Sequence, residues 1–156
     1  MKSSPACQHL VETEEGDHHE PYICPSGKWT VGIGHRLYPG DKIAGLSFDG
    51  KKWSGQISEL QSNQIFLADI AKFELAVTNA VKVPLMQREF DALVSLAFNI
   101  GREAFTDSTL VKMLNAKKPR RNCAAQFARW NKGEDKQPLD GLTIRRAREL
   151  CMFLGY

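Results

Sequence analysis

The spacing of apolar residues changes near residue 57, and this change limits the chain to a mixed fold. Residues 1–56 hold a short amphipathic start and then closely spaced turn signals at 25–27, 39–41 and 49–50. From residue 57 onward, apolar side chains recur at helical spacing. We therefore predict an α+β fold, with a small antiparallel β lobe and a larger helical lobe joined by a long helix.

The β lobe is expected at about residues 16–56. Its clearest strand is the run 28–34, where strand-forming side chains are followed by Gly32 and Gly34 at alternate positions. Glycines inside a strand indicate a place where another part of the chain or a ligand comes close. The run and the turn before it therefore predict a hairpin with a close neighbour.

The long connecting helix is expected at about residues 58–82. Ser58 and Gln61 have the spacing of a capping box, which begins a helix, and Val83 before Pro84 is a stop signal. The helical lobe then covers about residues 83–156 together with the N-terminal helix, and Gly101 is a plausible end cap within it. A length of 156 residues suits a single domain.

Charge and hydropathy exclude several classes of protein. The net charge is only +3, and no basic patch is interleaved with aromatic residues, so we expect no nucleic-acid binding. The basic run 117–121 is expected to be a solvated loop between helices. Because there is neither a bilayer-spanning apolar stretch nor a signal peptide, we expect a protein made in the cytoplasm, without membrane insertion, that reaches any external substrate by another route.

The four cysteines do not form a metal-binding pattern. No pair among Cys7, Cys24, Cys123 and Cys151 has the short separation of a zinc site, so no metal or cofactor is expected. In a cytoplasmic product they should begin as free thiols.

The segment 15–35 holds the residues that could carry chemistry. Glu15 would end the first helix, and the hairpin would bring Cys24 and Thr30 onto neighbouring strands facing it. A carboxyl group covered enough to stay protonated near neutral pH can act as a general acid. Thr30 offers a hydroxyl that can orient a water molecule. Taken alone, the spacing favours a surface glutamate, a half-buried cysteine and a strand threonine without a catalytic role.

Three ordered blocks resemble the phage-type lysozymes, glycoside hydrolase family 24. The first has a Glu, eight residues, an Asp or Cys, five residues and a Thr, leading into a GxGH motif, and matches Glu15, Cys24, Thr30 and residues 32–35. The second and third, residues 87–101 and 141–149, are similar to the family's core and closing helices. Together they cover about residues 7–154.

The resemblance implies a lysozyme-like fold with an active-site cleft between the lobes. It implies that Glu15 protonates the glycosidic oxygen, that Thr30 helps to position the attacking water, and that Cys24 fills the position of the second polar group. Gly34 would approach the saccharide and Asn99 would lie on the opposite wall. The implied reaction is hydrolysis of the β-1,4 bond between N-acetylmuramic acid and N-acetylglucosamine in peptidoglycan glycan strands, by an expected monomer.

Cys24 departs from the usual pair of catalytic carboxylates. It could act as a thiolate or hold a water molecule with Thr30, and the sequence does not distinguish these roles. The nearby carboxylates of Asp17 and Glu20 could contribute instead, although solvated surface groups are the simpler interpretation.

Two further pairs of residues carry expectations. By resemblance, His35 and Asp69 pair between the lobes. Trp53 and Trp130 could stack on sugars, and for Trp130 we favour a place in the core.

The main functional hypothesis is a phage endolysin that acts on the host cell wall after holin-type release. A bacterial muramidase effector or toxin, or part of a phage injection device, would use the same chemistry. A non-catalytic peptidoglycan-binding relative is the third alternative, and intact Glu15 and Thr30 argue against it.

Overall fold

The computed structural model describes residues 1–133 and 135–156, which form two compact units. One unit consists of residues 11–69, and the other combines residues 1–10 with 70–156. The boundaries fall within helix α1 (Pro5–Glu15) and helix α2 (Glu59–Ala80). Within the described residues, no helix is both long enough and apolar enough to cross a membrane.

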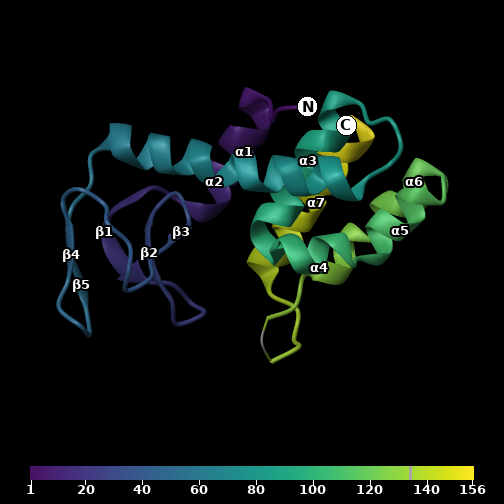
Figure 1. Ribbon diagram of the computed structural model, residues 1–156. Helices are drawn as coiled ribbons and strands as arrows, with labels where there is room; N and C mark the ends of the chain where they lie inside the picture. The colour runs from purple at the N-terminus through teal and green to yellow at the C-terminus, as the bar shows by residue number, and fades with distance from the viewer. Residues whose placement is uncertain (134) are drawn as a thin grey trace. The chain divides into compact units, whose positions relative to one another are not determined.

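The unit of residues 11–69 contains the strands (Figure 1). Strands β1 (His18–Ile23), β2 (Trp29–Gly32) and β3 (His35–Arg36) form an antiparallel sheet in that order, and β4 (Leu46–Phe48) pairs with β5 (Trp53–Gly55). Strand alternation places apolar side chains of both hairpins in one small core. Its buried members are Val31, Leu37, Trp53 and Ile57.

Helix α2 begins at the predicted capping box. The backbone N–H of Ser58 donates to Oε1 of Gln61 over 2.9 Å, and the N–H of Gln61 donates to Oγ of Ser58 over 3.2 Å. These two bonds satisfy N–H groups that the first helical turn leaves unpaired. The helix ends at Ala80, three residues before the position that Pro84 restricts.

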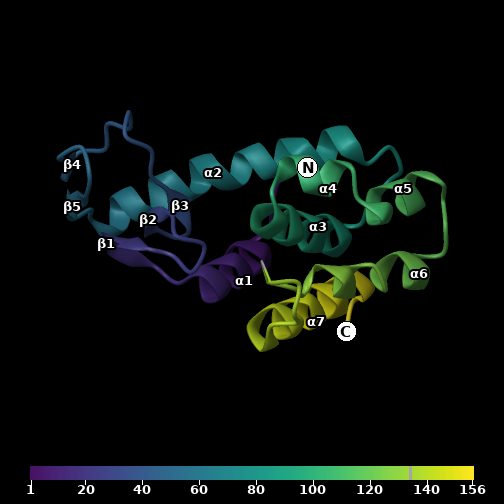
Figure 2. The same ribbon diagram turned by 90° about the horizontal axis from the view of Figure 1, so that it is seen from below.

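After α2, the elements described in the second unit are helices. It contains α3 (Gln87–Ile100), α4 (Arg102–Thr106), α5 (Thr109–Asn115), α6 (Arg120–Ala124), the 3-10 helix η1 (Phe127–Trp130) and α7 (Asp140–Leu154). Helix α3 packs against α7 (Figure 2). All residues from Glu89 to Ala97 are buried, so α3 is the central helix of this unit. The mixed helical and small-sheet architecture predicted from the sequence is confirmed.

The N-terminal residues of this unit are held by two buried carboxylates. The N–H and hydroxyl of Ser3 both donate to Oε1 of Glu74 over 2.7 Å, and Lys2 pairs with its other oxygen at 2.9 Å. Ser4 donates to both oxygens of Asp91. These bonds fix the segment that leads into α1.

One expectation for the basic run is wrong. Arg120 begins α6 instead of lying in a solvated loop, and its Nε donates to Oε1 of buried Glu89 over 2.7 Å. A buried carboxylate requires such a partner, and Glu89 lies 31 residues away in the sequence.

Candidate active site

Glu15 is the last residue of α1, where the chain turns into the sheet. Gly16 follows in the left-handed region, with φ +71°, and its N–H closes the final helical turn on the carbonyl of Glu12. The half-buried carboxyl group of Glu15 lies against Gly34, whose φ is +70°. A Cβ on Gly34 would be 3.2 Å from both Cγ and Oε2 of Glu15. The close neighbour predicted for the glycine run is therefore a side chain of the site itself.

Cys24 follows β1 directly, in the turn to β2. Its N–H donates to the carbonyl of Lys28 over 2.9 Å, and its sulfur lies 3.1 Å from Oγ of Ser26. The side chain is half-buried and the thiol is free. Burial raises the pKa of the thiol, but hydrogen bonds from Ser26 and from neighbouring groups lower it more, to about 7 from an ordinary 9.0. A large share of Cys24 is therefore thiolate at neutral pH.

Thr30 is brought close to Cys24 by the hairpin. It lies on β2 opposite Tyr22 and is 5% exposed. Its hydroxyl donates to the carbonyl of Lys28 over 3.2 Å, the same carbonyl that accepts from the N–H of Cys24. The nearby Thr30 hydroxyl also contributes to the lowered pKa of Cys24. The hydroxyl and the sulfur thus form one small polar group.

Tyr22 is a neighbour of this group that the sequence reasoning did not single out. Burial raises the pKa of its phenol, and the negative charges of Glu15 and Cys24 raise it further. Its ring packs against His18 with centroids 4.4 Å apart. The signal in the sequence was strand alternation, since a residue two positions before Cys24 shares its face of the strand.

His35 and Asp69 form the expected pair, with Nδ1 2.6 Å from Oδ2. Both residues belong to the unit of residues 11–69, so the expectation of a link between lobes is wrong. The pair instead fastens the sheet to α2 within one unit. The family resemblance predicted the two partners correctly. It did not predict that the boundary between the units falls just after Asp69.

Asp17 and Glu20 are the two carboxylates that could have taken part in catalysis in place of Cys24. Asp17 already forms hydrogen bonds with other side chains. Its oxygens lie 2.5 Å from Oγ of Ser62 and 3.0 Å from Nε2 of His19. These contacts give Asp17 a structural role in holding the start of α2 near β1. Glu20 is exposed on β1.

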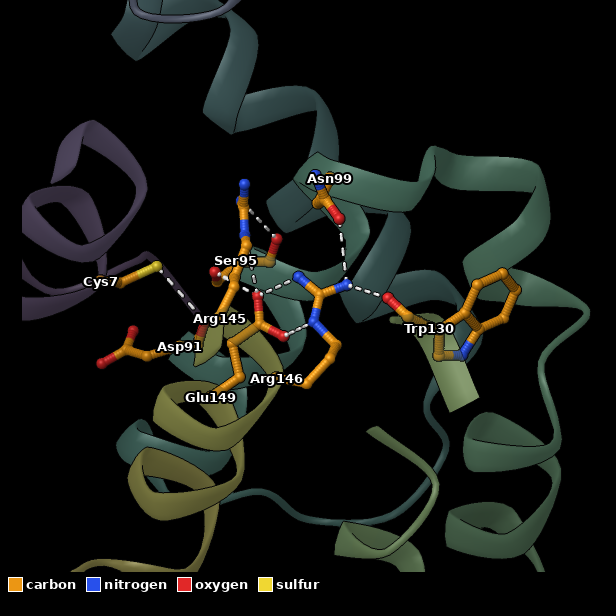
Figure 3. A network of polar contacts seen from close by, with 8 residues as sticks. All are labelled: Cys7, Asp91, Ser95, Asn99, Trp130, Arg145, Arg146 and Glu149. Atoms are coloured by element: carbon orange, nitrogen blue, oxygen red, sulfur yellow. Dashed lines mark hydrogen bonds and ion pairs between the residues drawn. The ribbon is translucent and has the colours of Figure 1, made fainter. Parts of the chain in front are cut away.

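Asn99 belongs to the other unit, near the end of α3. It is half-buried, and its Oδ1 accepts a hydrogen bond from Nη1 of Arg146 over 3.0 Å (Figure 3). Glu15, Cys24, Thr30 and Gly34 all belong to the unit of residues 11–69.

Trp53 and Trp130 occupy different environments. Trp53 is 3% exposed and part of the core of its unit, so it has no open face for a sugar. Trp130 is half-buried and lines an open cavity of about 410 Å³ with Ser108, Gln126 and Arg129, so its expected place in the core is wrong. Over the described ranges, 1–133 and 135–156, no group of three or more His, Cys, Asp or Glu residues is arranged to hold a metal ion.

Comparison with known proteins decides the family. The phage lysozyme family model matches residues 12–149. The chain belongs to the phage lysozyme family. The endolysin of Acyrthosiphon pisum secondary endosymbiont phage 1 is 36% identical over 149 residues, with 92% of each chain covered. The endolysin of Salmonella phage P22 is 36% identical over 147 residues, covering 93% of this chain and 92% of the relative.

Known lysozyme structures agree with this assignment. An endolysin from Escherichia coli O157:H7 phage FAHEc1 has a TM-score of 0.82 and 36% identity, with 99% of this chain and 94% of the other covered. The muramidase domain of SpmX from Asticaccaulis excentricus has a TM-score of 0.81 and 30% identity, with 98% and 97% covered. The fold class and the enzyme class expected from the sequence, a lysozyme among the glycoside hydrolases, are confirmed.

Proposed function

We propose that this lysozyme hydrolyses the β-1,4 bond between N-acetylmuramic acid and N-acetylglucosamine, with Glu15, Cys24 and Thr30 as its catalytic residues. The observation that carries the proposal is the environment of Cys24, whose pKa is lowered to about 7 beside the hydroxyls of Ser26 and Thr30. A lowered thiol pKa in a half-exposed polar site supports a chemical role, because a thiolate can accept a proton or act as a nucleophile.

Glu15 supplies the proton for the leaving group. As a carboxylic acid it protonates the glycosidic oxygen while the bond to the anomeric carbon breaks, leaving positive charge on the sugar ring. Because Gly34 has no side chain, only its backbone lies beside this carboxyl group. A larger residue there would occupy the space next to the reacting atoms.

Cys24 and Thr30 act on the water molecule. Thr30 orients the water by accepting or donating a hydrogen bond, and the thiolate of Cys24 accepts the proton that the water loses as its oxygen bonds to the anomeric carbon. The enzyme ends with Glu15 ionised and Cys24 protonated, so one proton passes from sulfur to carboxylate before the next cycle. This assignment gives Cys24 the role that a carboxylate fills in most glycosidases.

The unit of residues 1–10 and 70–156 also holds groups that could bind a sugar. Asn99 and the cavity lined by Trp130 offer hydrogen-bonding groups and one aromatic face, the combination that binds a sugar with its polar edges and apolar faces. We further propose that the protein works as a monomer, does not bind nucleic acid and does not insert into the membrane.

The proposed biological setting is host lysis. The endolysin relatives support action on the cell wall. Holin-type release from the cytoplasm is part of the proposal. Similarity to the SpmX muramidase domain is the observation that favours a bacterial setting as the second candidate. Expression in Escherichia coli with and without a co-expressed holin tests the release route: lysis only with the holin supports it, and lysis without the holin would contradict it.

The catalytic assignment is tested by the Glu15→Gln variant on permeabilised Gram-negative cells. Loss of a general acid should lower the rate of turbidity decrease by about 100-fold or more. Glu12→Gln is the matched control, since Glu12 is an exposed glutamate on the same helix and should keep full activity. A Glu15→Gln variant with more than about a tenth of wild-type activity would show that Glu15 is not the acid.

A further inference from the structure

Arg146, on α7, is a fully buried arginine held in one orientation. It is 2% exposed, and it forms a two-pronged pair with Glu149: Nε lies 2.8 Å from Oε2 and Nη2 lies 2.9 Å from Oε1 (Figure 3). Glu149 is itself completely buried and also accepts from Oγ of Ser95 over 2.8 Å. The hydrogen bond from Nη2 and the ion-pair contact of Nε meet the same carboxylate, so they hold the guanidinium group in one orientation.

The remaining nitrogen of Arg146 joins two segments that are distant in the sequence. Nη1 lies 3.0 Å from Oδ1 of Asn99, at the end of α3, and 3.3 Å from the carbonyl oxygen of Trp130, at the end of η1. In Figure 3 both oxygens point toward this nitrogen from different helices. One rigid group therefore sets the positions of Asn99 and Trp130 together.

This contact also decides which way the amide of Asn99 faces. An arginine only donates hydrogen bonds, so the atom of Asn99 that faces it must be the oxygen. The amide nitrogen then lies on the far side of the group, as Figure 3 shows. Asn99 is thereby presented as a hydrogen-bond donor, and the carbonyl bond anchors Trp130 where its side chain lines the cavity.

We propose that Arg146 is a positioning residue for glycan binding, which orients Asn99 to donate to an amide carbonyl of the substrate and fixes Trp130 at the cavity. The inference rests on the proposed function. The complementary group is the carbonyl of an acetamido group on the amino sugar or of the peptide stem, since peptidoglycan offers both. In this proposal the effect of Arg146 passes through Asn99 and Trp130, the two residues that its Nη1 contacts.

The test measures binding without turnover, in the Glu15→Gln background. The probes are purified disaccharide–tetrapeptide fragments and glycan strands whose peptide stems have been removed, and the dissociation constant is followed by NMR shifts. Arg146→Lys keeps the charge beside Glu149 but cannot hold Asn99 and Trp130 at once. It should weaken binding by about tenfold, as should Asn99→Ala, and the double variant should be no weaker than about twice either single variant.

The two probes locate the carbonyl. Equal weakening on both probes assigns the contact to the acetamido group, and weakening only on fragments with stems assigns it to the peptide. Ser95→Ala is the structural control, because it removes a bond to the same Glu149 without touching Asn99. Unchanged binding by Arg146→Lys, equal weakening by Ser95→Ala, or additive losses in the double variant would overturn the inference.

A near-isosteric variant keeps the test decisive if Arg146→Lys does not fold. Asn99→Asp keeps an oxygen facing Arg146, so the fold should be retained, but it removes the amide donors. It should weaken binding by at least tenfold, and wild-type affinity in this folded variant would overturn the donor role. Failure of the function itself would appear elsewhere, as lytic activity in Glu15→Gln or as its absence from the wild type.

Discussion

The carboxyl group of Glu15 lies against the backbone of Gly34, so closely that a methyl group on Gly34 would be 3.2 Å from its Cγ and Oε2. The turn between β2 and β3 thus depends on glycine for two independent reasons. The backbone adopts φ +70°, which L side chains rarely adopt, and the space beside the backbone is filled by the proposed general acid.

Gly34→Ala should therefore lower activity by at least tenfold, because Glu15 must move by several tenths of an ångström and geometry at the reacting group governs the rate. Gly50→Ala separates strain from displacement. Gly50 has a φ of +95° with nothing within 4 Å of its Cβ position, so its variant should lose about 1 kcal/mol of stability and keep its activity. Equal activity losses in both variants would mean that backbone strain alone is responsible.

The thiol of Cys24 should react with iodoacetamide at a rate that rises through a midpoint near pH 7, because the thiolate is the nucleophile and the pKa of Cys24 is about 7. Peptide mapping by mass spectrometry after timed labelling measures the rate at each cysteine. Cys7, whose pKa burial raises to about 12, is the internal control and should stay unlabelled in the folded protein.

Ser26→Ala should move the Cys24 midpoint upward toward 9.0, since the strongest hydrogen bond to the sulfur is lost. If the thiolate accepts a proton in catalysis, the acid limb of the activity profile should move upward with it. A midpoint that stays near pH 7 in Ser26→Ala would show that another group stabilises the thiolate.

Local signals explain what the sequence could predict. The capping box of Ser58 and Gln61 involves residues three positions apart, and it forms as expected because its geometry depends on little else. The same holds for the juxtaposition of Cys24 and Thr30, which follows from a short hairpin. Their proposed roles still depend on the family resemblance, since many hairpins place a cysteine near a threonine.

The contacts that the sequence could not predict join distant segments. Arg120 donates a hydrogen bond to Glu89, and Arg146 donates to Asn99 and to the carbonyl of Trp130. These bonds form only when the helices α3, α6 and α7 pack together. The spacing of residues in the sequence does not predict which other helix will pack against a given face of a helix. For the same reason, the sequence did not predict that Trp53 is buried in the core of its unit or that Trp130 lines a cavity.

Glu74 should make stability depend on pH in the acidic range. Burial raises its pKa, but the ion pair with Lys2 and the hydrogen bonds from Ser3 outweigh this, so the folded pKa lies below the ordinary value. The carboxylate therefore contributes stability that is fully present above the unfolded pKa, about 4.3, and is lost as pH falls through the lower folded pKa.

Glu74→Gln should lower the free energy of unfolding at pH 7 by about 1–3 kcal/mol and reduce its slope below about pH 5, as measured by urea denaturation. Lys2→Ala should cost less than about 1 kcal/mol, because Lys2 is 80% exposed. A pH dependence in Glu74→Gln as steep as that of the wild type would assign the acid sensitivity to another carboxylate.

The ends of α5 and α7 use the same backbone motif with different residues. After α5, the N–H of Lys118 bonds to the carbonyl of Met113 and that of Lys117 to Leu114. After α7, Tyr156 bonds to Cys151 and Gly155 to Met152. The residue in the left-handed conformation is Gly155 at α7, with φ +83°, but Lys117 at α5, with φ +54°.

Lys117→Gly should raise the free energy of unfolding by about 0.5–1 kcal/mol. A side chain in the left-handed region costs about 1–2 kcal/mol, and the greater freedom of glycine in the unfolded chain returns part of that gain. Gly155→Ala should have the opposite sign, because it introduces the same strain and places a Cβ 2.8 Å from Nε of Arg88. Urea denaturation of both variants decides the matter: a Lys117→Gly variant less stable than the wild type would show that the lysine side chain makes a stabilising contact larger than its backbone strain.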